Sequence, residues 1–115
     1  MLNNKSILVT GGTGFLGSAL VDYLVGQGER VRVLDLRPGA ESYQNGLVDS
    51  VVGDITSSSV INNALDGVGQ VYHLAAAHQG DWAIHKAVTV DAFAQLLEAY
   101  AEQGGGRIVA MSSVM

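Results

Sequence analysis

The stretch VTGGTGFLG, from Val9 to Gly17, has glycines spaced as G-x-x-G-x-x-G at Gly11, Gly14 and Gly17. Residues without side chains let backbone N–H groups approach a ligand closely. An apolar run precedes the stretch and a helical pattern follows it, and a helix N-terminus attracts phosphate through its free N–H groups and its dipole. The spacing alone is typical of a tight turn, but this setting favours a loop that cradles a pyrophosphate.

A carboxylate follows at the end of the next apolar run. Asp35 lies 18 residues after Gly17, where a carboxylate accepts hydrogen bonds from the ribose hydroxyls of a dinucleotide. A carboxylate there repels a 2′-phosphate, which favours NAD over NADP, although Arg37 keeps NADP as the less favoured alternative. Asp35 could instead cap the turn before Pro38. We expect the cofactor to contact Asp35, Arg37 and also Leu36, which lies between them.

The elements that must position these residues are strands and helices, which alternate along the chain. Apolar runs rich in β-branched residues predict strands over 6–10, 30–36, 48–52, 70–75 and 107–111. Strands that alternate with helices predict an α/β fold. The expected architecture is a Rossmann-like, doubly wound parallel sheet of about five strands in the order 3-2-1-4-5, with flanking helices and truncated after strand five.

Apolar residues at three- and four-residue spacing predict helices from Phe15 to the glycines at 26 and 28, over 57–66, and up to the three glycines at 104–106. The predicted buried stripe of the first helix consists of Leu16, Ala19, Leu20, Tyr23 and Leu24. That of the last and longest consists of Ala87, Val90, Ala94, Leu97 and Ala101.

Length and composition limit the function classes. The 115 residues, 48% hydrophobic and 15% charged, fit one globular domain over 1–115. A net charge of -5 with scattered basic residues argues against a nucleic-acid partner. The sequence has no membrane-spanning run or signal peptide, so we expect a cytoplasmic protein without a membrane partner. Cysteine is absent and His73, His78 and His85 form no ligand pattern, so no metal is expected.

The run from Thr10 to Gly17 resembles the nucleotide-binding motif of the extended short-chain dehydrogenase/reductases. This group contains nucleotide-sugar epimerases and dehydratases and the 3β-hydroxysteroid dehydrogenase-like enzymes. Gly53-Asp54-Ile55 resembles the family segment in which the Asp contacts the adenine amino group and the next residue packs on the adenine ring.

Two further stretches match in order. His73-Leu74-Ala75-Ala76 is similar to the family's H-L-A-A, which borders the cofactor's pyrophosphate and nicotinamide ribose. Met111-Ser112-Ser113 resembles the end of the fifth strand, where a Ser or Thr hydrogen-bonds the reacting oxygen. The resemblance therefore implies a catalytic hydroxyl at Ser113, with Ser112 as the alternative.

The resemblance also implies a set of cofactor-binding residues: Gly11, Thr13, Gly14, Phe15, Leu16, Gly17, Asp35, Leu36, Arg37, Asp54, Ile55, Leu74, Ala75 and Ala76. Some of these have a simpler interpretation from the sequence alone. Phe15 and Leu16 fit core positions of a helix, and Asp54 could cap the following helix. His73, beside this set, could be an interior histidine with its hydrogen bonds satisfied.

The chain departs from the family pattern in two places. The family uses a Tyr-x-x-x-Lys pair, in which Lys lowers the Tyr pKa for proton transfer. The residues four positions after the tyrosines at 23, 43, 72 and 100 are Gln27, Leu47, Ala76 and Gly104, and none is Lys. In the long helix, Thr89, Ala92 and Gln95 stand where the family has Asn, Gly and Asn.

The family's Tyr-Lys pair follows the strand that carries the Ser, and here the sequence stops at Met115. We therefore expect the NAD-binding portion of a longer oxidoreductase or epimerase/dehydratase that acts on a secondary alcohol or ketone, such as a nucleotide sugar or sterol-like small molecule. Alternatives are a non-catalytic dinucleotide-sensing regulator and an inactive fragment. The 115 residues alone should lack turnover, and exposed apolar surface near the fifth strand could support a homodimer.

Overall fold

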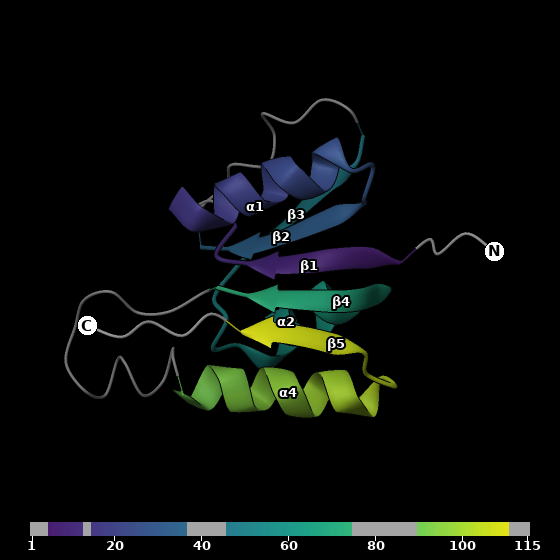
Figure 1. Cartoon of the computed structure of the whole chain (residues 1–115). Coiled ribbons are helices and arrows are strands. Elements are labelled where there is room, and N and C mark those ends of the chain that lie inside the picture. The colour runs from purple at the N-terminus through teal and green to yellow at the C-terminus, as the bar shows by residue number, and fades with distance from the viewer. Residues whose placement is uncertain (1–4, 13–14, 37–45, 75–89, 111–115) are drawn as a thin grey trace.

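The computed structural model describes residues 5–12, 15–36, 46–74 and 90–110. Helices and strands alternate along these ranges (Figure 1). In chain order they are β1 (Ser6–Thr10), α1 (Phe15–Gly26), β2 (Val31–Asp35), β3 (Val48–Val52), α2 (Ser58–Leu65), β4 (Val68–His73), α4 (Ala92–Glu102) and β5 (Arg107–Ala110).

Five parallel strands of the described chain form one sheet in the order β3-β2-β1-β4-β5. The predicted Rossmann-like topology is confirmed. The registers place Thr10 beside Leu34 on one side and beside His73 on the other, so the carboxyl ends of the strands meet at one edge of the sheet (Figure 1). The strand predicted over 70–75 is displaced, since β4 begins at Val68 and ends at His73.

Helices cover both faces of the central strands, as a doubly wound sheet requires. On one face Ile7, Val9, Val31 and Val33 pack against Val21 and Leu24 of α1. On the other face Leu8, Leu34 and Val71 pack against residues of α2 and α4, namely Ile61, Ala64, Leu65, Ala92, Leu96 and Tyr100. The side chains of β1 therefore alternate between two separate hydrophobic clusters.

The buried face of α4 differs from the predicted stripe. Ala92, Leu96 and Tyr100 are buried, whereas Leu97 is 42% exposed. The other predicted members within the described chain, Val90, Ala94 and Ala101, are exposed as well, and Ala87 lies outside the described residues. Apolar residues occur on two sides of this helix, and the side with Ala92, Leu96 and Tyr100 packs against α2 and the sheet.

The buried face of α1 is also predicted only in part. Leu24 is buried and Leu20 partly so, but Leu16 is 48% exposed, and Tyr23 and Ala19 are exposed too. Val21, which the predicted stripe omits, is fully buried. The interpretation of Leu16 as a core residue is therefore wrong. A helix with apolar residues on all sides does not reveal its inner face through spacing alone.

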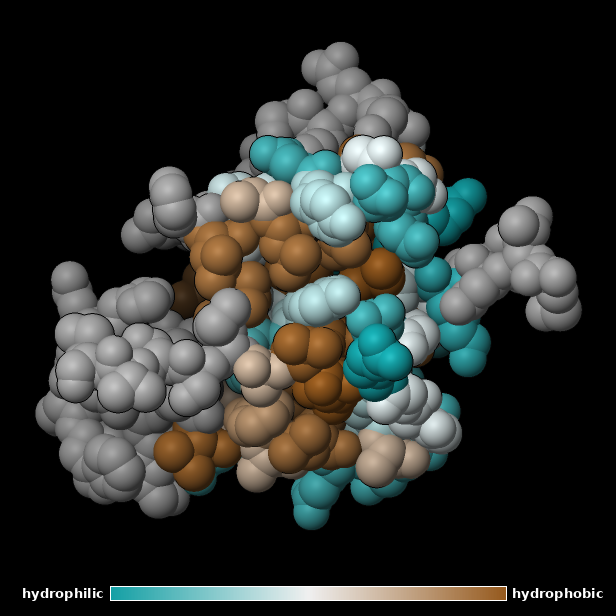
Figure 2. Space-filling model, viewed as in Figure 1, coloured by the Kyte–Doolittle hydropathy of each residue, from teal (hydrophilic) through white to brown (hydrophobic). Residues whose placement is uncertain are grey.

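Apolar side chains are exposed on the α1 side of the sheet, over β4 and β5 (Figure 2). Val109 of β5 is exposed, and Tyr72 and Leu74 are partly buried. Among the described helices only α1 packs on this face, against β1 and β2. Exposed apolar surface near the fifth strand is thus present, while the self-association expected from it stays a prediction.

Arg32 links β2 to the end of α2 and to β3. Its Nη1 donates hydrogen bonds to the carbonyl oxygens of Ala64, at 2.9 Å, and Asp66. Its Nε contacts Asp49 Oδ1 at 3.3 Å. The last carbonyl groups of a helix lack partners within the helix, and a cation there also interacts favourably with the helix dipole. Arg32 therefore acts as the C-terminal cap of α2.

We predict that Arg32→Met lowers the free energy of unfolding by about 1–2 kcal/mol, since two carbonyl groups lose a charged donor. The matched control is Asp49→Asn, which removes only the exposed ion pair and should cost about 0.5 kcal/mol or less. Urea denaturation of both variants measures the difference. Equal losses would show that the ion pair, and not the helix cap, carries the effect.

Candidate functional site

The carboxyl ends of β1 and β4 define the centre of the candidate site. β1 pairs with β2 on one side and with β4 on the other. The connection after β1 leads through α1 to β2, whereas α2 leads into β4 on the opposite side. Where successive connections leave in opposite directions, a crevice forms beyond the strand ends, and α/β proteins bind ligands there.

The glycine loop begins directly after Thr10. Gly11 has a φ of +72°, a conformation that favours glycine, and its N–H donates to the carbonyl of Leu34 at 2.8 Å. A Cβ on Gly12 would lie 2.6 Å from Cγ1 of Val33. The loop therefore crosses the end of β2 in contact with it. Thr13 and Gly14 lie outside the described residues, as does the side chain of Phe15.

Gly17 lies in the first turn of α1, against the loop itself. A Cβ on Gly17 would collide with the carbonyl oxygen of Gly11 and lie 2.8 Å from the Cα of Gly12. The three atoms nearest to such a Cβ are all loop backbone atoms. The role of Gly17 is therefore to let the helix start directly on the loop, which brings the helix N-terminus to the crevice.

We predict that Gly17→Ala lowers the free energy of unfolding by about 1–3 kcal/mol, because backbone atoms must move to admit the methyl group. Gly26→Ala, at the other end of α1, is the matched control. No described atom lies within 4 Å of a Cβ there, so this variant should gain up to about 1 kcal/mol in helix propensity. Thermal denaturation of both variants tests the contrast, and equal shifts would contradict it.

The end of β2 lies beside the glycine loop. Asp35 is the last residue of β2 and is partly buried, and its carbonyl accepts a hydrogen bond from the N–H of Gly53 at 3.0 Å. Leu36 is exposed, and Arg37 lies outside the described residues. Since Gly11 is bonded to Leu34, the structure brings Asp35 and the loop together at the same edge of the sheet.

Asp54 starts the turn between β3 and α2. Its Oδ1 accepts hydrogen bonds from the N–H of Thr56 at 2.9 Å and from the Thr56 hydroxyl at 2.7 Å. These bonds stabilise the carboxylate and lower the pKa of Asp54. Ile55 is only 7% exposed and packs in the cluster between the sheet, α2 and α4. Asp54 and Ile55 therefore each have contacts within the fold. The two hydrogen bonds from Thr56 reach the same oxygen of Asp54, Oδ1.

A buried polar pair joins the ends of β1 and β4. Thr10 Oγ1 lies 2.8 Å from Nδ1 of His73, and the N–H of Leu74 donates to the same Oγ1 at 3.0 Å. The His73 ring stacks on Phe93 of α4, with 4.9 Å between the ring centroids. The interior-histidine interpretation of His73 thus agrees with the structure. Thr10 ends one predicted strand and His73 lies within the predicted strand 70–75, but no local pattern in the sequence indicates that the two residues pair.

Burial lowers the pKa of His73 below its usual 6.5, because the charged ring loses its hydration. The unfolded chain therefore takes up a proton at a higher pH than the folded chain does. We predict that the free energy of unfolding is highest above pH 6.5 and falls as the pH drops towards the lowered pKa of the folded state.

His73→Phe removes this titration and leaves the other two histidines in place. Its free energy of unfolding should change less than that of the unaltered protein between about pH 7.5 and about pH 5. Urea denaturation at a series of pH values measures both curves. Parallel curves would show that His73 does not contribute to the pH dependence.

The remaining predicted residues, namely Ala75, Ala76, Ser112 and Ser113, lie outside the described residues. Within the ranges that the structure describes, no group of three or more His, Asp or Glu side chains could hold a metal ion, and no helix is long and apolar enough to cross a membrane.

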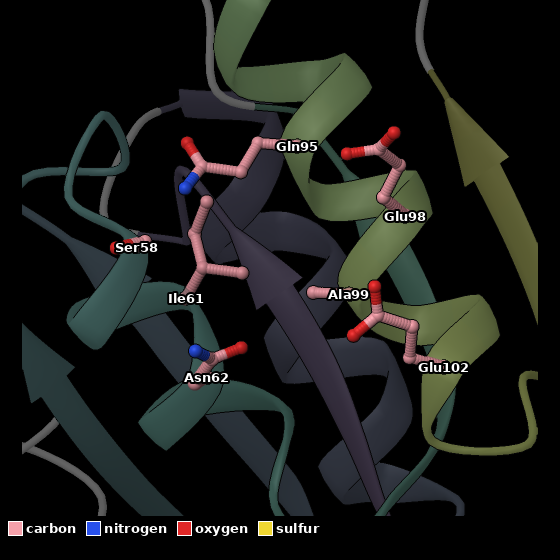
Figure 3. A pocket seen from close by; sticks show the side chains of 7 residues that line it. All are labelled: Ser58, Ile61, Asn62, Gln95, Glu98, Ala99 and Glu102. Atoms are coloured by element: carbon pink, nitrogen blue, oxygen red, sulfur yellow. The ribbon is translucent and has the colours of Figure 1, made fainter.

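A separate pocket of about 160 Å³ lies between α2 and α4 (Figure 3). Its polar lining includes the exposed carboxylates Glu98 and Glu102. Two carboxylates would repel a pyrophosphate. This pocket is therefore unsuited to a dinucleotide, and the carboxyl edge of the sheet remains the candidate site.

A glycine loop at the switch point of a 3-2-1-4-5 parallel sheet defines a Rossmann-like domain. Within that class, the chain belongs to the NAD-dependent epimerase/dehydratase family, whose model matches residues 7–115. The family resemblance read from Thr10–Gly17 and the later motifs is confirmed.

The matches include a sterol dehydrogenase and solved structures that contain NAD. Sterol-4-alpha-carboxylate 3-dehydrogenase (decarboxylating) of Bos taurus is 39% identical over 72 residues, which are 63% of this chain and 19% of the bovine protein. The structure of MoeE5 in complex with UDP-glucuronic acid and NAD matches with a TM-score of 0.83 and 32% identity, over 94% of this chain and 36% of that one. Uronate dehydrogenase of Agrobacterium tumefaciens, also solved with NAD, matches with a TM-score of 0.84 and 26% identity, over 95% of this chain and 41% of that one.

The chain thus spans well under half the length of these relatives. The family model, which matches residues 7–115, covers the glycine loop, the strand ends and nearly the whole sheet described above.

Proposed function

We propose that the carboxyl edge of the sheet binds NAD. The observation that carries this proposal is the hydrogen bond of 2.8 Å between Gly11 N–H and Leu34 O, which holds the glycine loop beside Asp35. Because Gly17 has no Cβ, the helix N-terminus can also lie close to the loop. Solved relatives that contain NAD support the choice of cofactor.

In this proposal the pyrophosphate lies on the glycine loop, with Thr13 and Gly14 as further contacts. Asp35 accepts hydrogen bonds from the adenosine ribose, and its negative charge disfavours the 2′-phosphate of NADP. Leu36, which is exposed at this edge, and Arg37 border the same end of the cofactor. Phe15 and Leu16 join this set from the first turn of α1.

Asp54 and Ile55 border the adenine in this proposal, and Leu74, Ala75 and Ala76 border the nicotinamide end. The two hydrogen bonds from Thr56 reach only Oδ1 of Asp54. Oδ2 of Asp54, which accepts no hydrogen bond from the described chain, is the atom for the adenine amino group. Ile55 is 7% exposed, so little of its side chain is left to contact adenine.

We propose further that residues 1–115 form a single NAD(P)-binding domain, the N-terminal part of a longer NAD-dependent oxidoreductase or epimerase/dehydratase. The bound nicotinamide would supply or accept hydride. Ser113, or alternatively Ser112, would hold the oxygen of a secondary alcohol or ketone, and a Tyr-Lys pair beyond this chain would transfer the proton. The sterol and uronate dehydrogenases among the relatives support this chemistry.

The cofactor proposal is tested by calorimetric titration of the full-length protein with NAD and NADP. We expect NAD to bind more tightly, and Asp35→Ala to weaken NAD by about tenfold, which corresponds to the loss of hydrogen bonds to a charged group. Asp49→Asn is the matched control, because Asp49 lies near the opposite end of the neighbouring strand. It should leave the NAD affinity unchanged.

Tighter binding of NADP, or an Asp35→Ala variant as good as the unaltered protein, would overturn the role of Asp35. NAD binding without turnover of any alcohol or ketone by the full-length protein would instead favour a dinucleotide-sensing regulator.

A further inference from the structure

We propose that His73 is a positioning residue for the cofactor site: its Nδ1 accepts the hydroxyl proton of Thr10 and so orients Thr10 Oγ1 towards the N–H of Leu74. This bond network ties the end of β1, which leads into the glycine loop, to the end of β4, which leads to Ala75 and Ala76. The inference rests on the proposed function, since the ligand held between these two strand ends is NAD.

The direction of the bond from Leu74 follows from the groups involved, whereas that of the bond to His73 depends on the tautomer of the ring. The N–H of Leu74 can only donate, so Thr10 Oγ1 is the acceptor of that bond, at 3.0 Å. Thr10 Oγ1 lies 2.8 Å from Nδ1 of His73, and in our proposal its hydroxyl proton points at Nδ1. Nδ1 then accepts through its lone pair, and the proton of the neutral ring is on Nε2.

Burial fixes this arrangement. Thr10 is 0% and His73 5% exposed, so water does not readily replace either partner. The plane of the His73 ring lies within 5° of the plane of Phe93, and this stack holds the ring edge towards β1. His73 is thus positioned by α4 and in turn positions Thr10, one residue before the loop.

Protonation of His73 would reverse one bond of the network, because Nδ1–H donates and the Thr10 hydroxyl proton must turn away. The groups that face His73 are Thr10 from β1, Phe93 from α4 and, in register, Ala110 of β5. None of these three is ionisable. Burial is the cause of its lowered pKa, with no charged side chain of the described chain contributing. We therefore expect NAD affinity to fall at acidic pH.

Titration of the full-length protein with NAD at about pH 7.5 and about pH 5.5 tests the inference with paired variants. His73→Phe keeps an aromatic ring against Phe93 but loses the acceptor, so NAD affinity should fall about fivefold, the equivalent of one buried hydrogen bond. His73→Asn places an amide oxygen near the position of Nδ1 and should restore affinity to within about twofold. It should also abolish the loss at acidic pH.

Thr10 provides the second half of the test. Thr10→Val should match His73→Phe, and the double variant should be no weaker than either single variant, because both remove the same bond. Thr10→Ser, which retains the hydroxyl, should bind as the unaltered protein does. An Asn variant as weak as the Phe variant, or additive losses in the double variant, would overturn the positioning role.

Nitrogen NMR of His73 gives a readout that needs no NAD. We expect Nδ1 without a proton and Nε2 with one at about pH 7.5, and faster exchange of the Leu74 amide in His73→Phe. A proton on Nδ1 would overturn the inference by itself. Failure of the unaltered protein to bind NAD would overturn the proposed function, whereas NAD binding that His73→Phe does not affect would overturn only this inference.

Discussion

The first turn of α1 lies so close to the glycine loop that no side chain fits at Gly17, whose missing Cβ would collide with the carbonyl of Gly11. The position of the helix depends on this contact. A Cβ on Gly12 would likewise collide with the side chain of Val33. Val33 packs in the cluster that holds α1 on the sheet. Loop, strand and helix therefore fix one another, and free N–H groups reach the crevice only because all three are in place.

The second strand end is held by different means. Gly53 donates a hydrogen bond to the carbonyl of Asp35, and a Cβ on Gly53 would lie 2.9 Å from the side chain of Val60 in α2. Asp54 then closes its turn through Thr56. The turn that starts α2 is thus tied to the residue proposed to bind the ribose, so packing of α2 on the sheet contributes to the position of Asp35.

Strand order and the loop could be predicted from the sequence because they depend on local patterns: buried apolar runs, glycine spacing and a carboxylate at a strand end. The inner faces of α1 and α4 could not. Leu16 and Leu97 are as apolar as Val21 and Leu96, and only contacts with other elements decide which of them is buried. The Thr10–His73 pair likewise depends on the register between β1 and β4, which no local pattern contains. The sequence allows two interpretations of Asp54, as an adenine contact or as a cap of the following helix. Its bonds to Thr56 agree with the capping interpretation and leave its other oxygen available to a ligand.

Stability alone does not account for the polar pair at the end of β1. The N–H of Leu74 also has the carbonyl oxygen of Thr10 as an acceptor, at 3.1 Å, so the backbone would remain paired without the Thr10 hydroxyl. A valine and a phenylalanine would fill similar space at positions 10 and 73, and replacing both partners of a buried hydrogen bond by apolar groups of the same shape is often nearly neutral. An apolar pair would, however, remove both side-chain hydrogen bonds between the two strand ends. What the hydroxyl and the imidazole add is direction, because a hydrogen bond weakens steeply when its angle changes, whereas apolar packing tolerates sliding. Such directional restraint matters most where two strands diverge around a ligand, and Thr10 and His73 lie at that point of the sheet.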